Sequence, residues 1–386
     1  FIVEAANDYK IRYKQILVTD KPLITFGSKT STYQWEVNNI AAIKEEVFQP
    51  EWDEVTPNVV IAPTKFEFGG FNGDMTTWSG IGQYASNLYT GRDVLPDNVK
   101  AEVHKLTDNL STRSEKVQTL YDYLQKNTRY ISIQLGIGGY QPFPAKDVAA
   151  KKYGDCKALS NFMVSMLQEV GIKAYSAWVK AGEGRRGLYD DFPADYFNHV
   201  IACVPDGKDT TWLECTSQTE SAGYMGSFTG NRKALLLSNE GGQVVNTPFY
   251  TLKDNLQLRK INGVVTDDGT LLVDVSTRFT GQQQESQHGL MHGASPEQRE
   301  RYLNNAINLA TYKVEKSEYK EQKGKIPAIN EYLKITAPHY ASVSGKRLFI
   351  VPNIFNRDGA KLSTDEPRKF DIRFDFPYRD VDTIHI

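Results

Sequence analysis

The segment around Cys156 has the residue types expected of a thiol nucleophile. Residues 153–158 read Tyr-Gly-Asp-Cys-Lys-Ala, where a glycine-containing loop meets the start of a periodic apolar segment. Asp155 is a natural N-cap, so Cys156 is predicted to lie in the first turn of a helix. The backbone N–H groups and the helix dipole there stabilise a thiolate and suit an oxyanion. The neighbouring charge of Asp155 argues against this, and a small buried cysteine is the common alternative.

A second segment offers a base and a group to orient it. Residues 197–204 and 210–216 are strand-like, and Asp206-Gly207 between them is a strong hairpin signal. A two-residue turn centred on this pair sets His199 opposite Glu214, with their Cβ atoms about 5 Å apart. The carboxylate then fixes the imidazole tautomer and leaves the other ring nitrogen for a nucleophile. A structural His–Glu pair is the alternative. Together with Cys156, however, the pattern predicts a catalytic triad of Cys156, His199 and Glu214.

A metal site is not expected. His288 and His292 have the spacing of metal ligands on a helix, but Gly289 and Gly293 beside them argue against a helix. No cysteine or acidic cluster completes a site, and thiol chemistry at Cys156 requires no metal or organic cofactor.

The remaining cysteines, histidines and tryptophans are interpreted as structural. Cys203 is expected on the same strand face as His199 and near the site, whereas Cys215 is expected in the core. The other members of this set are predicted to pack or to lie exposed: His104, His339, His385, Trp178 and Trp212.

Periodicity along the chain predicts an α+β protein. Residues 1–95 are predicted to form strands and turns, with glycines such as Gly80 and Gly82 in the turns. Helices are predicted at 97–109, at 113–127 with a Thr112–Glu115 capping box, and at 156–170. Strands are predicted at 173–180, 197–204 and 210–216, and a turn at 136–144. Beyond residue 250 the pattern is again strand-like, including 271–279, 370–376 and the last five residues, with one helix announced by Ser295-Pro296.

These patterns divide the chain into three domains. A β-rich domain is expected at 1–95, a mixed domain at 96–245, and a β-rich domain with one helix at 246–386. The formal net charge of −2 gives no argument for a nucleic-acid partner. No apolar run is long enough for a membrane-spanning helix. The chain opens on Phe1 and ends in a strand-like tail, so we expect a piece of a longer product, and the lack of an export signal in the given sequence decides nothing about export.

The motifs that carry this chemistry resemble the transglutaminase-like core, a superfamily of papain-like thiol enzymes. The matching segments are 154–157 (Gly-Asp-Cys-Lys), 197–200 (Phe-Asn-His-Val) and 212–216 (Trp-Leu-Glu-Cys-Thr). That superfamily carries Cys, His and Asp in this order, whereas the histidine of papain itself lies much farther along its chain. The resemblance covers about residues 96–240. One position departs from it, since Glu214 stands where the family usually has Asp.

The resemblance implies a fold, an activity and a location. It implies a papain-like core between β-rich, sandwich-like flanking domains, the first of them truncated, as in exported proteins of Bacteroidetes-type bacteria. It implies a thiol enzyme acting on peptide or glutamine side-chain amides in the periplasm or at the cell surface, with a peptide or protein as substrate. It also invites a side-chain oxyanion donor, for which Gln134 is the first candidate, with Gln141 and Tyr130 as competitors.

Two other functions stay open. A core that has lost turnover would be a scaffold that binds peptide or glycan. An acyl-CoA-dependent N-acetyltransferase would use the same triad, although no further feature of the sequence requires it.

Overall fold

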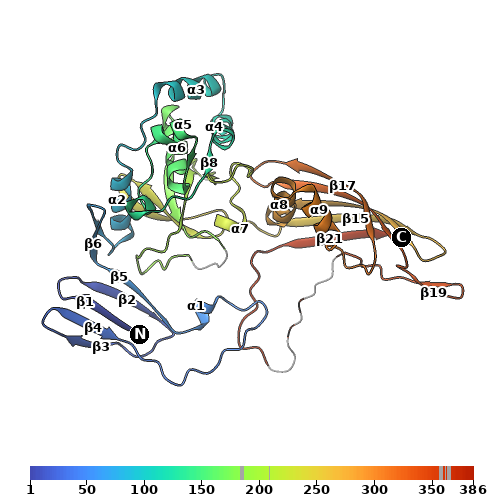
Figure 1. Cartoon of the computed structure of the whole chain (residues 1–386), viewed down its shortest axis with the longest axis horizontal. Helices are drawn as coiled ribbons and strands as arrows, with labels where there is room; N and C mark the ends of the chain where they lie inside the picture. The colour runs from blue at the N-terminus through green and yellow to red at the C-terminus, as the bar shows by residue number, and fades with distance from the viewer. Residues whose placement is uncertain (183–186, 208, 356–359, 361, 363–366) are drawn as a thin grey trace. The chain divides into compact units, whose positions relative to one another are not determined.

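The protein is described by a computed structural model that covers residues 1–182, 187–207, 209–355, 360, 362 and 367–386. The chain divides into two compact units (Figure 1). Unit 1 comprises Phe1–Phe249 with Arg368–Arg373, and unit 2 comprises Tyr250–Pro367 with Phe374–Ile386. Helices and strands occur in both units, so the predicted α+β class is confirmed. None of the helices within the described ranges is long and apolar enough to cross a membrane.

The centre of unit 1 is a five-stranded antiparallel sheet with the order β12-β11-β10-β13-β14. Its strands are β10 (Tyr175–Val179), β11 (His199–Val204), β12 (Thr211–Leu213), β13 (Lys233–Ser238) and β14 (Gly241–Asn246). Side chains alternate between the two faces of a strand. Ala202 and Val204 therefore pack in the cluster formed with the helices, whereas Ile201 and Cys203 pack in a separate cluster on the other face.

Four helices gather beside this sheet (Figure 1). They are α3 (Asp97–Thr107), α4 (Arg113–Asn127), α5 (Ala145–Lys151) and α6 (Cys156–Glu169). The predicted Thr112–Glu115 capping box is present at the start of α4. In α6 the residues from Cys156 to Leu167 are all buried, so the helix that begins with the candidate nucleophile is also the central helix of the core. The sequence predicted three of these helices and missed the short α5.

The first part of unit 1 contains small sheets and a helix that the sequence did not predict. The sheets are β1 (Ile2–Ala6), β4 (Thr30–Gln34) and β3 (Leu23–Phe26); β2 (Ile11–Ile16) with β5 (Asn58–Pro63); and β6 (Lys65–Phe68) with β7 (Phe71–Asp74). A short helix, α1 (Trp52–Val55), precedes β5.

The expectation of only strands and turns before residue 95 is wrong at α2 (Trp78–Tyr89), which contains Gly80 and Gly82. A Cβ atom on Gly82 would lie 2.0 Å from the backbone nitrogen of Gly242, so this glycine allows α2 to pack directly against β14.

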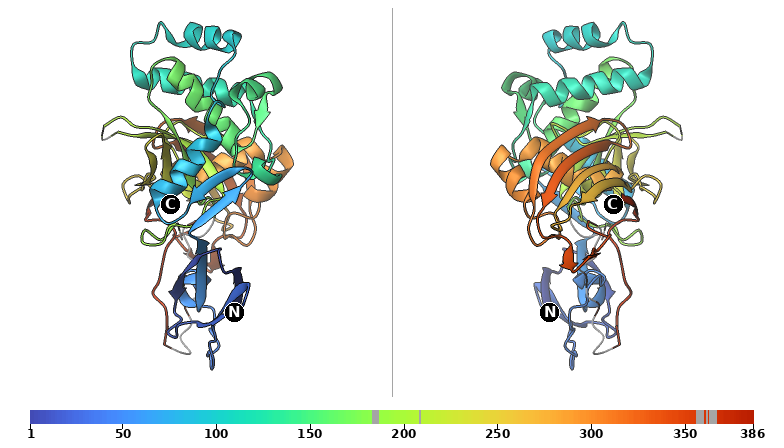
Figure 2. Two further views of the ribbon diagram at one scale, coloured as in Figure 1. Left: turned by 90° about the vertical axis from the view of Figure 1, so that its left-hand side faces the viewer. Right: turned by 90° about the vertical axis from the view of Figure 1, so that its right-hand side faces the viewer.

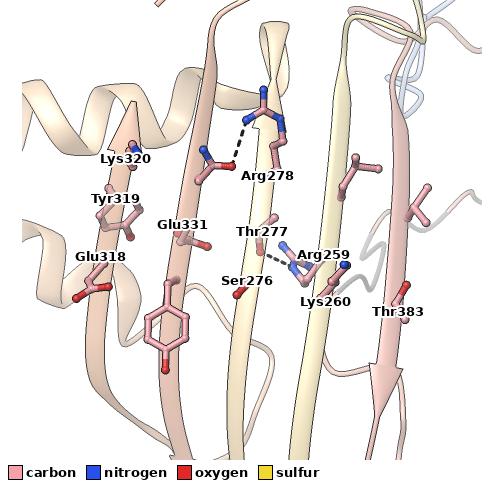
Figure 3. Close-up of a pocket in the computed structure, with 14 residues that line it drawn as sticks. Arg259, Lys260, Ser276, Thr277, Arg278, Glu318, Tyr319, Lys320, Glu331 and Thr383 are labelled. Carbon is pink, nitrogen blue, oxygen red and sulfur yellow. Dashed lines mark hydrogen bonds between the residues drawn. The ribbon is translucent and has the colours of Figure 1, made fainter. Parts of the chain in front are cut away.

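Unit 2 is a five-stranded sheet with helices on one face (Figure 2). Its order is β17-β18-β16-β15-β21, with β15 (Leu256–Val265), β16 (Leu271–Thr280), β17 (Lys313–Gln322), β18 (Ala328–Ala337) and β21 (Arg379–His385). The helices are α8 (Glu285–Gly293) and α9 (Pro296–Leu303), and β19 (Ser342–Ser344) pairs with β20 (Arg347–Phe349). A hollow of about 940 Å³ is lined by residues from all five strands, including Arg278, Glu318 and Glu331 (Figure 3).

Two predictions for the part of the chain after residue 250 are wrong. Gly289 and Gly293 do not prevent a helix, since both lie within α8. This helix continues directly from a 3-10 turn at Gly281–Gln284. Residues 370–376 alternate apolar and polar types but form no strand, and Ile372 and Phe374 are exposed. The predicted helix at Ser295-Pro296 is α9, which begins with the expected cap.

Candidate active site

Cys156 is the first residue of α6, as its sequence context predicts. The N-cap Asp155 accepts a hydrogen bond from the backbone nitrogen of Ala158 at 3.0 Å, which fixes the start of the helix. The first-turn N–H groups of a helix have no partners within the helix. The thiol therefore lies at the positive end of α6, beside donors that suit an oxyanion.

Lys157 offsets the negative charge beside the thiol. Its Nζ lies 2.6 Å from Oδ2 of Asp155, and both side chains are almost completely buried. From the sequence alone, Asp155 was expected to disfavour a thiolate, and Lys157 was not predicted as its counterion. The available signal was the presence of Asp155 and Lys157 on either side of Cys156. The pair leaves no net charge next to Cys156.

His199 and Glu214 form a buried pair. Nε2 of His199 lies 3.0 Å from each carboxylate oxygen of Glu214, and Oε1 also accepts from the backbone nitrogen of Thr216 at 3.2 Å. Tyr121 of α4 donates to the backbone carbonyl of Glu214 at 2.8 Å, which anchors the end of β12 against the helices. Because Glu214 occupies Nε2, the ring nitrogen available to Cys156 is Nδ1.

The predicted register of this hairpin is wrong by two residues. Val204 pairs with Thr211 and Ala202 with Leu213, so an extended ladder would place Thr216, not Glu214, opposite His199. The connection is longer than a two-residue turn, and a turn within it is closed by the bond from Asp209 to Asp206. Glu214 is the first residue after β12 and reaches His199 diagonally. A shift of two residues preserves the alternation of faces, so the contact survives.

The electrostatics of the pair favour an imidazolium beside a carboxylate. Burial alone would lower the pKa of His199, but the Glu214 carboxylate and the Cys156 sulfur outweigh burial and raise the pKa to about 10. Burial would raise the pKa of Glu214, but the charge of His199 and hydrogen bonds from Thr216 hold this pKa below its ordinary value. Phe228 packs edge-on against the imidazole with ring centroids 5.2 Å apart.

A pocket of about 350 Å³ is lined by both Cys156 and His199. Cys156 is only 3% exposed, yet its atoms line the pocket, as expected of a nucleophile at the base of a cleft. Tyr140, Trp178 and Phe197 form an aromatic wall, with Trp178 5.8 Å from Phe197 and 6.1 Å from Tyr140 between ring centroids. Trp178, expected only to pack, therefore also faces the pocket.

Of the three oxyanion candidates, Gln134 lines this pocket. The segment β8 (Arg129–Tyr130) runs parallel to β9 (Tyr153–Gly154), which brings the chain before Gln134 alongside the chain before Cys156. Gln141 instead accepts a hydrogen bond from Arg92 at 2.8 Å. Tyr130 lies in β8 and does not line the pocket.

One comparison with known proteins matches the segment of the chain that holds this site. Residues 100–215 match the transglutaminase-like superfamily. The chain contains a transglutaminase-like domain. The matched residues run from α3 to Cys215, so they include Cys156, His199 and Glu214.

Solved structures and curated proteins add little to this domain assignment. The chain is similar to a putative protease from Parabacteroides distasonis, with 14% identity, a TM-score of 0.47 and coverage of 86% of this chain and 65% of that one. A putative cysteine protease from Cytophaga hutchinsonii has 10% identity, a TM-score of 0.29 and coverage of 63% and 76%. The chain thus spans 65% of the length of the first of these proteins. No curated protein matches the chain.

The other two cysteines of the transglutaminase-like domain lie in its cores. Burial raises the pKa of the Cys203 thiol to about 12. Cys203 packs with Ile201 and Trp212 and does not line the pocket of Cys156, so the expected proximity to the site is wrong. Cys215 packs with the helices, as expected, and burial followed by the charge of Glu214 raises its pKa.

Proposed function

We propose that the chain is a cysteine-dependent enzyme that processes amide bonds of peptides or proteins through an acyl-thioester. The observation that carries the proposal is the buried His199–Glu214 pair in the same pocket as the Cys156 thiol. An inactive scaffold requires no raised pKa at His199 and no path from solvent to Cys156.

The first half of the reaction forms the acyl-enzyme. With its proton held by His199, the Cys156 sulfur attacks the amide carbon and the carbonyl oxygen becomes an oxyanion. The N–H groups at the start of α6 and the Gln134 side chain supply donors for that oxyanion. His199 then gives its proton to the leaving nitrogen, the C–N bond breaks, and an amine departs.

The second half releases the acyl group. Water or a second amine attacks the thioester carbon while His199 accepts a proton from it, and the C–S bond breaks to regenerate the thiolate. Glu214 holds the imidazole in one orientation throughout and stabilises its charged form. These steps use only the side chains and backbone of this domain.

The lining of the pocket suggests which amides it accepts. Asp195 is exposed at the pocket and accepts a hydrogen bond from the Tyr140 hydroxyl at 2.7 Å. Its carboxylate, next to the wall of Tyr140, Trp178 and Phe197, favours substrates with an apolar group and a cationic group or free amine near the amide.

The proposal is tested with an unfolded protein such as reduced casein, offered with and without a fluorescent primary amine. Mass spectrometry reads new peptide ends, which report hydrolysis, and fluorescence reads amine incorporation, which reports transfer. Either product is expected from the native chain and from a His104→Ala control, whose histidine is exposed. No product from Cys156→Ser or His199→Ala is expected, whereas equal product from Cys156→Ser would contradict the proposal.

A further inference from the structure

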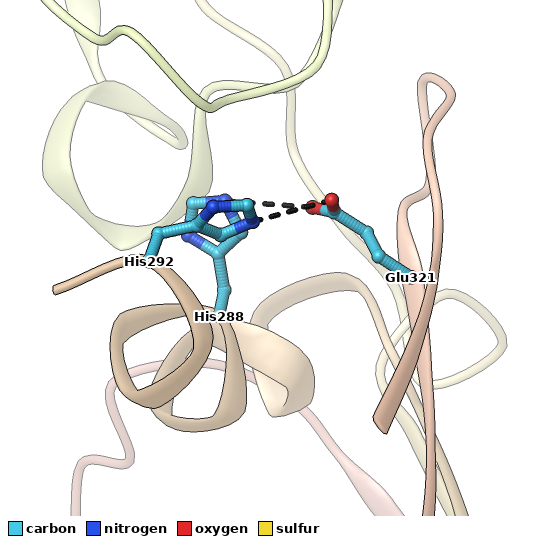
Figure 4. A group of neighbouring side chains, drawn as sticks. All are labelled: His288, His292 and Glu321. Carbon is cyan, nitrogen blue, oxygen red and sulfur yellow. Dashed lines mark hydrogen bonds and ion pairs between the residues drawn. The ribbon is translucent and has the colours of Figure 1, made fainter. Parts of the chain in front are cut away.

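Two histidines and a glutamate converge in unit 2, and none of them takes part in the proposed thiol chemistry. His288 and His292 lie on α8, and Glu321 lies on β17 (Figure 4). Each offers one ligand atom, and these atoms all lie within 4.8 Å of one another. Residues four apart lie on the same face of a helix, so both imidazoles point toward the same strand.

The imidazoles of His288 and His292 both lie close to the carboxylate of Glu321. Nε2 of His288 lies 3.5 Å from Oε1 of Glu321, and Nε2 of His292 lies 3.2 Å from Oε2. The two ring centroids are 4.5 Å apart. Two nitrogens and a carboxylate thus surround one point, which is the donor set that zinc commonly takes in proteins.

We propose that His288, His292 and Glu321 bind a zinc ion. Zinc binds imidazole nitrogen at about 2.0–2.1 Å and carboxylate oxygen at about 2.0–2.2 Å, with tetrahedral geometry. At a tetrahedral angle these bond lengths separate two ligand atoms by about 3.3–3.5 Å. The two Nε2–oxygen distances, 3.2 and 3.5 Å, agree with that separation. Three protein ligands leave the fourth position for water or for a donor from another molecule.

The burial of the three side chains suits a bound ion. The side chains of His288 and Glu321 are 10% and 15% exposed, so solvent screens the cluster little. His292 is 31% exposed and provides the side from which an ion enters. A bound ion would join α8 to β17, which is an edge strand that pairs only with β18 among the described residues.

The sequence contained part of this signal. The spacing of His288 and His292 is visible, but Glu321 is contributed by a separate strand after α9. Gly289 and Gly293 argued against the helix that aligns the two imidazoles. An added Cβ on either glycine would meet nothing within 4 Å, so no close packing requires glycine at these positions.

The test is a zinc titration of tag-free chain that carries Cys156→Ser, because the Cys156 thiol and His199 could otherwise bind zinc themselves. Calorimetry should give one ion per chain, and the melting temperature should rise with zinc concentration. Cobalt in place of zinc should give the visible absorption of a site with nitrogen and oxygen ligands. His292→Ala and Glu321→Gln should each weaken zinc binding at least about tenfold.

Matched controls separate this site from adventitious binding. His385→Ala removes an exposed histidine of β21, and Glu318→Gln removes an exposed carboxylate of β17, so both should leave zinc affinity unchanged. His292→Gln repeats the test with a polar side chain if His292→Ala lowers the melting temperature of the metal-free protein. Unchanged zinc affinity in the His292 and Glu321 variants, or no binding at micromolar zinc, would overturn the proposal.

Discussion

Glu214 contacts His199 along a diagonal of the β11–β12 hairpin, with Nε2 of the imidazole 3.0 Å from both carboxylate oxygens. The ladder ends at Leu213, and the residue in phase with His199 is Thr216. Thr216 instead donates its backbone N–H to Glu214, which holds the carboxylate in place. The acid of the proposed triad is thus positioned by the end of a strand and by one neighbouring residue.

Glu214→Gln should slow acylation of Cys156 by an activated ester by roughly 10²-fold or more, because the neutral amide no longer stabilises the imidazolium. Glu214→Asp keeps the charge but shortens the arm by one methylene, so its rate should lie between those of Glu214→Gln and the native chain. Stopped-flow release of nitrophenolate measures both rates. The exposed Glu240→Gln serves as control, and a native rate in Glu214→Gln would refute the assigned role.

Folding stability should fall at alkaline pH because of His199. Its pKa in the folded chain, about 10, is raised above the ordinary value of 6.5. The protonated imidazole therefore stabilises the fold in full below about pH 6.5, and this contribution is lost as the pH rises toward 10. Urea unfolding at pH 7 and pH 10 should show a larger loss of unfolding free energy in the native chain than in His199→Gln. Equal losses would show that the imidazole is not held in its charged form.

Lys157→Met should destabilise unit 1 by about 3–5 kcal/mol, because it leaves the buried Asp155 carboxylate without its partner. The uncompensated charge should also disfavour the thiolate of Cys156 and slow its alkylation. The double variant Asp155→Asn/Lys157→Met removes both charges and keeps an N-capping side chain, so it should recover most of the stability. Chemical unfolding of the three proteins tests this, and a double variant no more stable than Lys157→Met would contradict it.

Gly82→Ala and Gly289→Ala should change stability in opposite directions. A Cβ on Gly82 would overlap the backbone of Gly242, so unit 1 should lose about 1–3 kcal/mol. A Cβ on Gly289 meets nothing, and alanine in a helix is favoured over glycine, so unit 2 should gain up to about 1 kcal/mol. Thermal unfolding followed by hydrogen exchange assigns each change to its unit. A neutral Gly82→Ala would show that α2 and β14 do not pack this closely.

Helices that begin with a capping residue and keep a regular apolar period were predicted correctly from the sequence. The Thr112–Glu115 capping box gave the start of α4, and Asp155 gave the start of α6. By contrast, α2 and α8 contain glycines that a single sequence cannot distinguish from turn residues. In α2 the reason for glycine is the backbone of β14, which lies far along the chain.

The sequence nominated the residues of the candidate site but did not predict their geometry correctly. The order and context of Cys156, His199 and Glu214 were sufficient to nominate them, and their catalytic roles remain predictions. The register of the hairpin depends on the length of its connection. The Asp206-Gly207 pair indicated a two-residue turn, whereas the connection is longer. The burial of Lys157 beside Asp155 could not be predicted, because it depends on which side chains the folded core encloses. The predicted export also remains a prediction.

The role of Cys156 as the nucleophile is tested most directly by the reactivity of the three cysteines toward iodoacetamide at neutral pH, measured by peptide mass spectrometry. Cys156 lines a pocket, whereas Cys203 and Cys215 are buried with raised pKa values. We expect rapid labelling of Cys156 alone, slowed by His199→Ala and unaffected by His104→Ala. Labelling of Cys156 no faster than that of Cys203 and Cys215, or a rate independent of His199, would contradict it.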